Sequence, residues 1–193
     1  MKKLLALLLA LLLALAATAC AQTAAPAPPT AAPEARGDTL VACFSATGNT
    51  RAVAEKLAAL LDADLYEIVP AEPYTEEDLD YGDRESRTSL EMDDPEARPE
   101  IAGEPLDLTG YTTLYLGYPI WHGEAPRILS TFVESCDLDG LTVRPFCTSG
   151  GSGIARSAEA LEALAGAGAW LEGQRFSASV SDEELQAWID EAA

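Results

Sequence analysis

An uninterrupted apolar run at residues 39–44 (TLVACF) leads directly into a loop rich in hydroxyl side chains, and an amphipathic stretch follows. A short, continuously apolar segment is typical of a strand buried on both faces of a parallel sheet. Over residues 49–61, apolar side chains recur with the period of a helix. Parallel strands must be joined by a crossover, so this strand and helix predict the start of a βαβ unit.

The same alternation recurs along the chain. We expect further strands at 64–69, 112–118, 141–147 and, more weakly, 170–177, with helices at 125–134 and 154–165. Ser181 and Glu184 form a capping box that opens a last helix. Buried strands that alternate with helices predict an α/β fold, in which helices cover both faces of a parallel sheet. Residues 37–193 have the size of a single domain.

Residues 70–110 interrupt this pattern. They are acidic, contain five prolines and offer only a short helical stretch near residues 76–92. So long a segment without a clear strand is usually a functional loop or covers a site. Arg87, Glu91 and Arg98 either form a buried ion network there or close over a ligand, and the sequence does not distinguish these two roles.

The N-terminus has the pattern of an export signal. Two lysines precede an apolar run of Leu and Ala, so we interpret residues 1–19 as a signal peptide. Small residues before Cys20 resemble a bacterial lipobox, in which this cysteine is lipidated. The alternative is an ordinary secretory signal cut near Ala19. Residues 20–36 then comprise the lipidated Cys and an Ala/Pro-rich linker, which would hold an extracytoplasmic domain away from the cell membrane.

The chain has 12 Lys and Arg against 32 Asp and Glu, a net charge of −20. Such acidity argues against a nucleic-acid-binding protein, because phosphate backbones need clustered cations. It also repels anionic lipids, so we expect membrane contact through the lipid anchor only. One histidine and four cysteines predict neither a metal cluster nor a disulfide scaffold.

The first loop after a strand has the features of a phosphate site. It consists of Ser45, Ala46, Thr47, Gly48, Asn49 and Thr50. Its hydroxyls can donate to phosphate oxygens, and the following helix offers free N–H groups. No Walker lysine or GxGxxG turn is present, so an uncharged pocket for one terminal phosphate is expected. The alternative is a Ser/Thr-rich cap on an ordinary helix.

This loop resembles the flavodoxin signature [S/T]-x-T-G-N-T, which cradles the phosphate of FMN in that family. The resemblance continues in residues 80–87, Glu91, 98–101, 117–121 and 148–153, and it places the chain among short bacterial flavodoxin-like proteins. It implies a flavodoxin-like three-layer sandwich, with a five-stranded parallel sheet of order 2-1-3-4-5. It also implies FMN as the cofactor.

Two further loops then become cofactor-binding candidates. The second contains Tyr118, Pro119, Ile120, Trp121, His122 and Gly123, and the third contains Thr148, Ser149, Gly150, Gly151, Ser152 and Gly153. We expect Tyr118 and Trp121 to present aromatic faces to the flavin ring at the pocket rim, although Trp121 could instead be a core residue. The glycines would let main chain approach a flat ligand, or simply make a flexible connector.

The resemblance implies an FMN-binding electron-transfer protein. Together with the predicted lipid anchor at Cys20, we expect a monomer tethered at the outer face of the membrane. Reduced flavin is anionic, and none of the three loops contains Lys or Arg, so we expect one-electron transfer to be favoured. Net acidity would steer the protein to basic redox partner proteins. The alternatives are an FMN-dependent NAD(P)H or quinone oxidoreductase on the same fold, and a non-redox binding lipoprotein that has lost the cofactor.

Overall fold

The computed structural model describes residues 37–191. The predicted signal peptide, linker and lipidated Cys20 lie outside this range, so these predictions are untested. Within it, no helix is long and apolar enough to cross a membrane.

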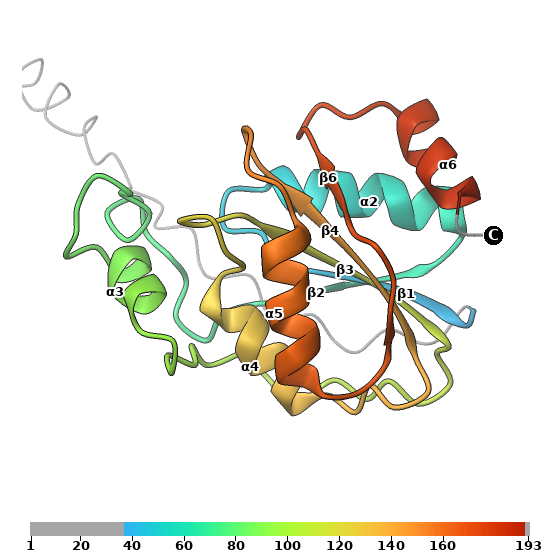
Figure 1. The fold of residues 1–193 in the computed structure, drawn as a ribbon, viewed down its shortest axis with the longest axis horizontal. Helices are drawn as coiled ribbons and strands as arrows, with labels where there is room; N and C mark the ends of the chain where they lie inside the picture. The colour runs from blue at the N-terminus through green and yellow to red at the C-terminus, as the bar shows by residue number, and fades with distance from the viewer. Residues whose placement is uncertain (1–36, 192–193) are drawn as a thin grey trace, which may run out of the picture.

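Strands and helices alternate along the chain as expected (Figure 1). The strands are β1 (Thr39–Cys43), β2 (Asp64–Glu67), β3 (Thr113–Pro119), β4 (Thr142–Thr148), β5 (Ala169–Trp170) and β6 (Gln174–Phe176). The helices are α2 (Asn49–Leu61), α3 (Arg87–Asp93), α4 (Arg127–Ser135), α5 (Ala155–Ala165) and α6 (Asp182–Asp190). The predicted capping residue is confirmed, because the Ser181 side chain accepts a hydrogen bond from the Glu184 N–H.

All the strand pairs are parallel, and the order is β2-β1-β3-β4-β5, which confirms the predicted topology. The predicted fifth strand at 170–177 was wrong in one respect. Two short strands, β5 and β6, share that place and pair with successive parts of β4. Gly173 lies in the break between them, and a Cβ there would come within 2.9 Å of the Pro145 carbonyl oxygen. A side chain at residue 173 would therefore collide with β4 and with Ile154, which explains the glycine in the break of the edge strand.

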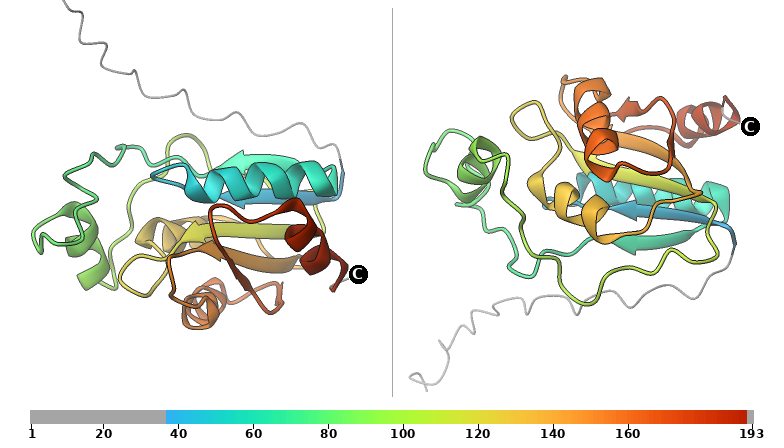
Figure 2. Two further views of the ribbon diagram at one scale, coloured as in Figure 1. Left: turned by 90° about the horizontal axis from the view of Figure 1, so that it is seen from above. Right: turned by 60° about the horizontal axis from the view of Figure 1, so that its bottom comes forward.

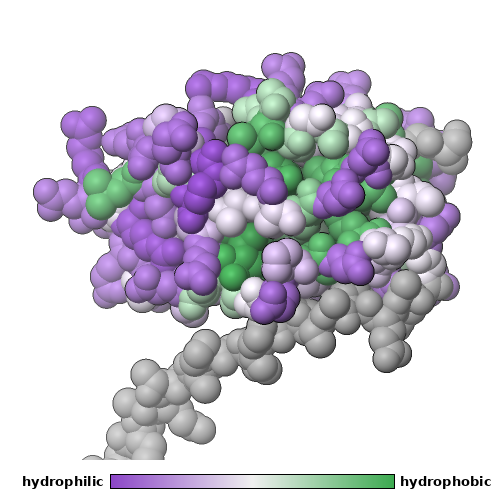
Figure 3. Space-filling model, turned by 90° about the horizontal axis from the view of Figure 1, so that it is seen from below, coloured by the Kyte–Doolittle hydropathy of each residue, from purple (hydrophilic) through white to green (hydrophobic). Residues whose placement is uncertain are grey.

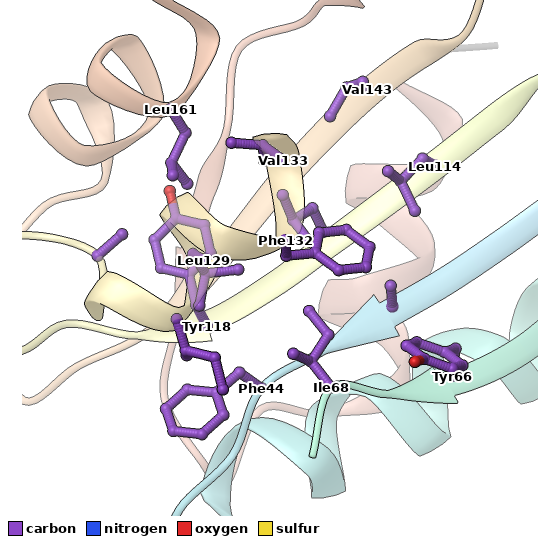
Figure 4. Packing of buried hydrophobic residues seen from close by; sticks show 14 of the residues in the cluster. Phe44, Tyr66, Ile68, Leu114, Tyr118, Leu129, Phe132, Val133, Val143 and Leu161 are labelled. Atoms are coloured by element: carbon purple, nitrogen blue, oxygen red, sulfur yellow. The ribbon is translucent and has the colours of Figure 1, made fainter. Parts of the chain in front are cut away.

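Helices α2 and α6 cover one face of the sheet, and α4 and α5 cover the other (Figures 1 and 2). Because every interior strand is covered on both sides, consecutive residues Leu40, Val41 and Ala42 are all fully buried. Figure 4 shows the packing on the α4 side, where Phe132 and Leu129 lie over β3. Packed side chains on both faces of the sheet therefore support the strand ends.

Residues 70–110, which we call the cover, leave the sheet after β2 and return to it at β3. Helix α3 lies within the cover, beyond the end of the sheet (Figures 1 and 2). Hydrophilic residues gather over this side of the molecule in the space-filling view (Figure 3). The cover is tied to itself by an isolated antiparallel bridge between Pro70 and Ile101.

Candidate functional site

A pocket of about 450 Å³ lies where the carboxyl ends of β1, β3 and β4 meet. In an open parallel sheet this edge is the usual place for a ligand. The volume is within the range of small-molecule sites. It is lined by Ser45, Ala46, Thr47, Asn49, Thr50, Tyr81, Pro119, Trp121, Thr148, Ser149, Gly150, Ser177 and Ala178. Residues of all three predicted loops thus come together.

The N-terminus of α2 opens into this pocket without a cap from its own chain. Gly48 occupies the N-cap position with φ of +84°, a left-handed conformation that favours glycine, and no side chain caps the helix. Within residues 37–191, the backbone N–H groups of residues 46–51 donate no hydrogen bond. The Asn49 amide donates to the Thr47 hydroxyl over 3.2 Å, which orients that oxygen. A helix N-terminus with free amides and a hydroxyl rim is suited to an anion.

The first and third loops are joined by a buried hydrogen bond. The hydroxyls of Thr50 and Thr148 lie 2.7 Å apart, and both residues are buried. They come from the start of α2 and the end of β4, which are 98 positions apart in the chain. This bond fixes the distance between two walls of the pocket.

The second loop ends in a tight turn. Trp121 and Glu124 exchange both backbone hydrogen bonds at 2.9 Å, and His122 and Gly123 between them have φ of +49° and +87°. Positive φ at both central residues defines a type I′ turn, for which glycine is favoured at the second position. The His122 ring contacts the Tyr81 ring edge-on. His122 and Gly123 therefore shape the turn beside the pocket without lining it.

The prediction that Tyr118 lies at the rim was wrong. Its side chain points from β3 toward α5, its hydroxyl lies 3.2 Å from that of Ser157, and it is fully buried (Figure 4). The cause is the alternation of side chains along β3, which directs Tyr118 to the α5 face. Ile120 also packs against the core instead of lining the pocket.

Trp121 is both a pocket residue and a core residue. It lines the pocket, but only 2% of the residue is exposed, because its ring packs edge-on against Phe44 and Tyr74. The prediction of an open aromatic face at the rim was therefore wrong in this structure. The pocket-facing aromatic with a free surface is Tyr81, which is 53% exposed.

The sequence reasoning missed Tyr81, Ser177 and Ala178. Tyr81 comes from the cover, and burial raises the pKa of its hydroxyl. Its position within the flavodoxin-like stretch 80–87 was the available signal. Ser177 and Ala178 follow β6, and no motif marks them.

The third loop contributes only its first part to the pocket. Thr148, Ser149 and Gly150 line it, whereas residues 151–153 are exposed beyond it. Arg175 of β6 donates to the Ser149 carbonyl over 3.3 Å. A guanidinium therefore approaches this loop from a neighbouring strand, although the loops themselves contain no cation.

Cys147, which precedes Thr148 of the pocket wall, is a buried thiol. Burial raises the pKa of Cys147 to about 12, so this thiol stays protonated at neutral pH. Cys43, Cys136 and Cys147 are free thiols. The part of the chain that the structure describes holds no cluster of side chains that could bind a metal ion.

A family model described as flavodoxin matches residues 38–192. The chain belongs to the flavodoxin family. That assignment agrees with the sheet order and with the place of the pocket at the carboxyl ends of the strands. None of the curated proteins matches the sequence significantly.

Solved structures with the flavodoxin fold resemble the whole described domain. A candidate flavoprotein from Bacteroides uniformis ATCC 8492 is 44% identical, with 80% of this chain and 98% of that chain covered and a TM-score of 0.77. One from Bacteroides eggerthii DSM 20697 is 45% identical over 80% and 96% of the two chains, with a TM-score of 0.75. A flavoprotein from Lactobacillus acidophilus NCFM, solved in complex with FMN, shares the fold at 22% identity, 79% and 99% coverage and a TM-score of 0.61.

Proposed function

We propose that this member of the flavodoxin family binds FMN and transfers electrons between protein partners. The observation that carries the proposal is the uncapped N-terminus of α2, where free amides and the hydroxyls of Ser45, Thr47 and Thr50 surround one end of the pocket. These donors fit a single phosphate group, and the pocket leaves room for a ring system beside it. Membership of the flavodoxin family and the Lactobacillus acidophilus complex support FMN as the ligand.

Each wall of the pocket has a distinct task in this proposal. The loop at residues 45–50 would hold the phosphate, and Tyr81 with Trp121 would form an aromatic wall for the ring. Backbone N–H groups near Ser149 and Gly150 would face polar atoms of the ring. Bound FMN would supply electron transfer, which the protein side chains cannot provide themselves. The chain's own part is to bind the group, orient it and set the charge around it.

The charge around the pocket favours a carrier over a nicotinamide-dependent reductase. Residues 72–100 contain 12 acidic and 3 basic side chains, and this segment brings Tyr81 to the pocket. Two of the three arginines are neutralised: Arg87 pairs with Glu91 and Arg98 with Glu134. An acidic segment that reaches the pocket through Tyr81 repels the pyrophosphate of NAD(P)H and attracts a basic protein. We therefore infer a basic redox partner protein.

An FMN titration tests the central proposal. The wild-type domain should take up FMN and become yellow, and Thr47→Ala with Asn49→Ala should weaken binding at least tenfold, because the hydroxyl and the side chain that orients it are lost. Thr131→Ala is the control, since the Thr131 hydroxyl donates to the Pro99 carbonyl away from the pocket. A colourless wild-type protein would refute FMN binding, and unchanged uptake by the double variant would refute the phosphate-binding role of the loop at residues 45–50.

Reduction kinetics test the carrier role. NAD(P)H should reduce the FMN-loaded protein slowly, whereas exchange with a basic cytochrome should be rapid and should slow steeply as ionic strength rises. Rapid reduction by NAD(P)H that saturates with its concentration would favour the reductase instead.

We also propose that the mature protein is a lipoprotein at the outer face of the cell membrane, anchored through Cys20. The small residues before Cys20 and the Ala/Pro-rich linker after it support this location. In a membrane fractionation, wild-type protein should sediment with the membrane, and Cys20→Ala should not. Membrane association that persists in Cys20→Ala would contradict anchoring by this residue.

A further inference from the structure

Tyr74, a residue of the cover that does not line the pocket, connects the cover to two pocket walls. Its ring lies edge-on to Trp121 at 5.1 Å and to Phe44 at 5.9 Å between centroids. Trp121 lines the pocket, and Phe44 immediately precedes the loop that begins at Ser45. Phe44 and Trp121 also contact each other at 5.4 Å. The three rings thus form one cluster behind the pocket.

The opposite side of Tyr74 is held by charged groups. Its hydroxyl donates to Glu91 over 2.6 Å, and the Arg87 guanidinium lies 4.0 Å from its ring centroid. Arg87 also donates to the second Glu91 oxygen over 2.7 Å and to the Glu72 carbonyl over 2.9 Å. Hydrogen bonds to charged groups, and a guanidinium stacked on a ring, are among the stronger polar contacts in proteins.

These contacts define a clamp made of Tyr74, Arg87 and Glu91. Each member is at least partly buried, and none of them lines the pocket. The cover does not depend on the clamp for its internal hydrogen bonds, because the Thr88 and Ser89 hydroxyls already donate to the carbonyls of Asp78 and Asp83. What the clamp adds is a fixed position for the ring that supports Trp121.

We propose that Tyr74 is a positioning residue of the flavin site, which acts through Trp121 and is itself oriented by Glu91 and Arg87. This inference rests on the proposed FMN binding. Trp121 lines the pocket together with Tyr81. When the clamp is intact, the Trp121 side chain is held in place before the ligand arrives, and binding does not have to order it.

The test compares two tyrosines that each donate to a carboxylate. Tyr74→Phe removes the hydroxyl and keeps the ring. Tyr111→Phe is the matched control, because Tyr111 donates to Asp64 over 3.0 Å at the start of β2, away from the pocket. For each variant, the measurements are the FMN dissociation constant, the visible circular dichroism of bound FMN, and the urea stability of the ligand-free protein.

We expect Tyr74→Phe to bind FMN about tenfold more weakly, because a tenfold change corresponds to the loss of one hydrogen bond to a charged group. We also expect the visible circular dichroism of bound FMN to change. Tyr111→Phe should lower urea stability and leave both flavin measurements unchanged. Glu91→Gln, which keeps an acceptor for the hydroxyl, should fall between wild type and Tyr74→Phe. If Tyr74→Phe lowers only urea stability, the residue is merely structural and the inference is wrong. If wild type binds no FMN, the proposed function itself fails.

Discussion

The parallel sheet and the cover bury different kinds of side chain. The centre of the sheet is apolar on both faces, with residues such as Leu40, Val143 and Phe146 fully buried. The cover buries Ser86, Thr88 and Ser89 beside a few apolar residues. These hydroxyls are satisfied within the segment: Thr88 donates to the Asp78 carbonyl at 2.7 Å. The sheet is held by apolar burial, and the cover by hydrogen bonds and ion pairs.

This difference has a consequence for the pocket, because its walls come from both regions. The phosphate end rests on β1 and α2, whose buried side chains are mostly apolar. The wall that contains Tyr81 depends on the cover. Polar contacts at a protein surface are individually weaker than buried apolar ones, so the cover should open before the sheet unfolds.

The largest effect is expected in the sheet, for Phe146→Ala. The Phe146 ring lies directly against Gly117 of the next strand, where a Cβ would come within 2.2 Å of it. Removing a fully buried ring leaves a cavity and should lower the free energy of unfolding by ~3–5 kcal/mol. Urea denaturation of the ligand-free domain measures this. A loss below ~1 kcal/mol would mean that the sheet is not the stabilising region.

The difference between the apolar sheet and the polar cover also explains which parts of the fold could be predicted from the sequence. Apolar periodicity specifies a strand or a helix through local residues alone, so the order of elements and the bounds of α2 at 49–61 were predictable. The edge strand was harder to predict, because Gly173 in its break lies against Pro145 of β4, a contact that no local pattern records.

Within the candidate site, the phosphate loop was predictable because its signature is contiguous. Ten of the predicted pocket residues line the cavity, but Tyr118 does not, since a glycine–tyrosine–proline stretch does not reveal which face of β3 a side chain takes. Tyr81 was missed because the cover has no period. Its ring contacts His122 of the second loop, which lies far from Tyr81 in the sequence.

The next largest effect is expected at the junction between the cover and the sheet, for Arg127→Met. Arg127 of α4 donates to the carbonyls of Met92 at 2.9 Å, Asp94 at 3.1 Å and Glu91 at 3.3 Å, at the end of α3. A cation at a helix C-terminus is favourable. Its loss should cost about 2 kcal/mol and should increase hydrogen exchange in α3 more than in β1.

Arg156→Met is the matched control for this prediction. Arg156 and Arg127 both pair with Glu124, but the Arg156 side chain is 80% exposed against 15% for Arg127. Since an exposed ion pair contributes little, Arg156→Met should cost well under 1 kcal/mol and leave hydrogen exchange in α3 unchanged. If both variants lose the same free energy of unfolding, the stabilisation comes from pairing with Glu124 and not from capping of α3.

The smallest effect expected is a loss of folding stability at acid pH, and it should arise from contacts of the cover. The hydrogen bond from Arg98 lowers the pKa of Glu134, and the Thr75 backbone N–H lowers the pKa of Asp78. A carboxyl with a lowered pKa in the folded state adds stability above its unfolded pKa of about 4, and that stability is lost as pH falls through the folded pKa. Both groups are exposed enough for screening, so we expect less than about 1 kcal/mol in total.

Acid also protonates the many other carboxylates and relieves their mutual repulsion, so the absolute change in stability between pH 7 and pH 3 is uninformative. The informative quantity is the difference between variants. Glu134→Gln with Asp78→Asn should lose less stability on acidification than wild type, because its two anchored carboxylates are already neutral. Glu162→Gln, an exposed residue of α5, is the control for one lost charge and should behave as wild type. If the double variant loses stability on acidification in parallel with wild type, the acid-sensitive contacts lie outside the cover, and the contrast between the two regions does not extend to pH.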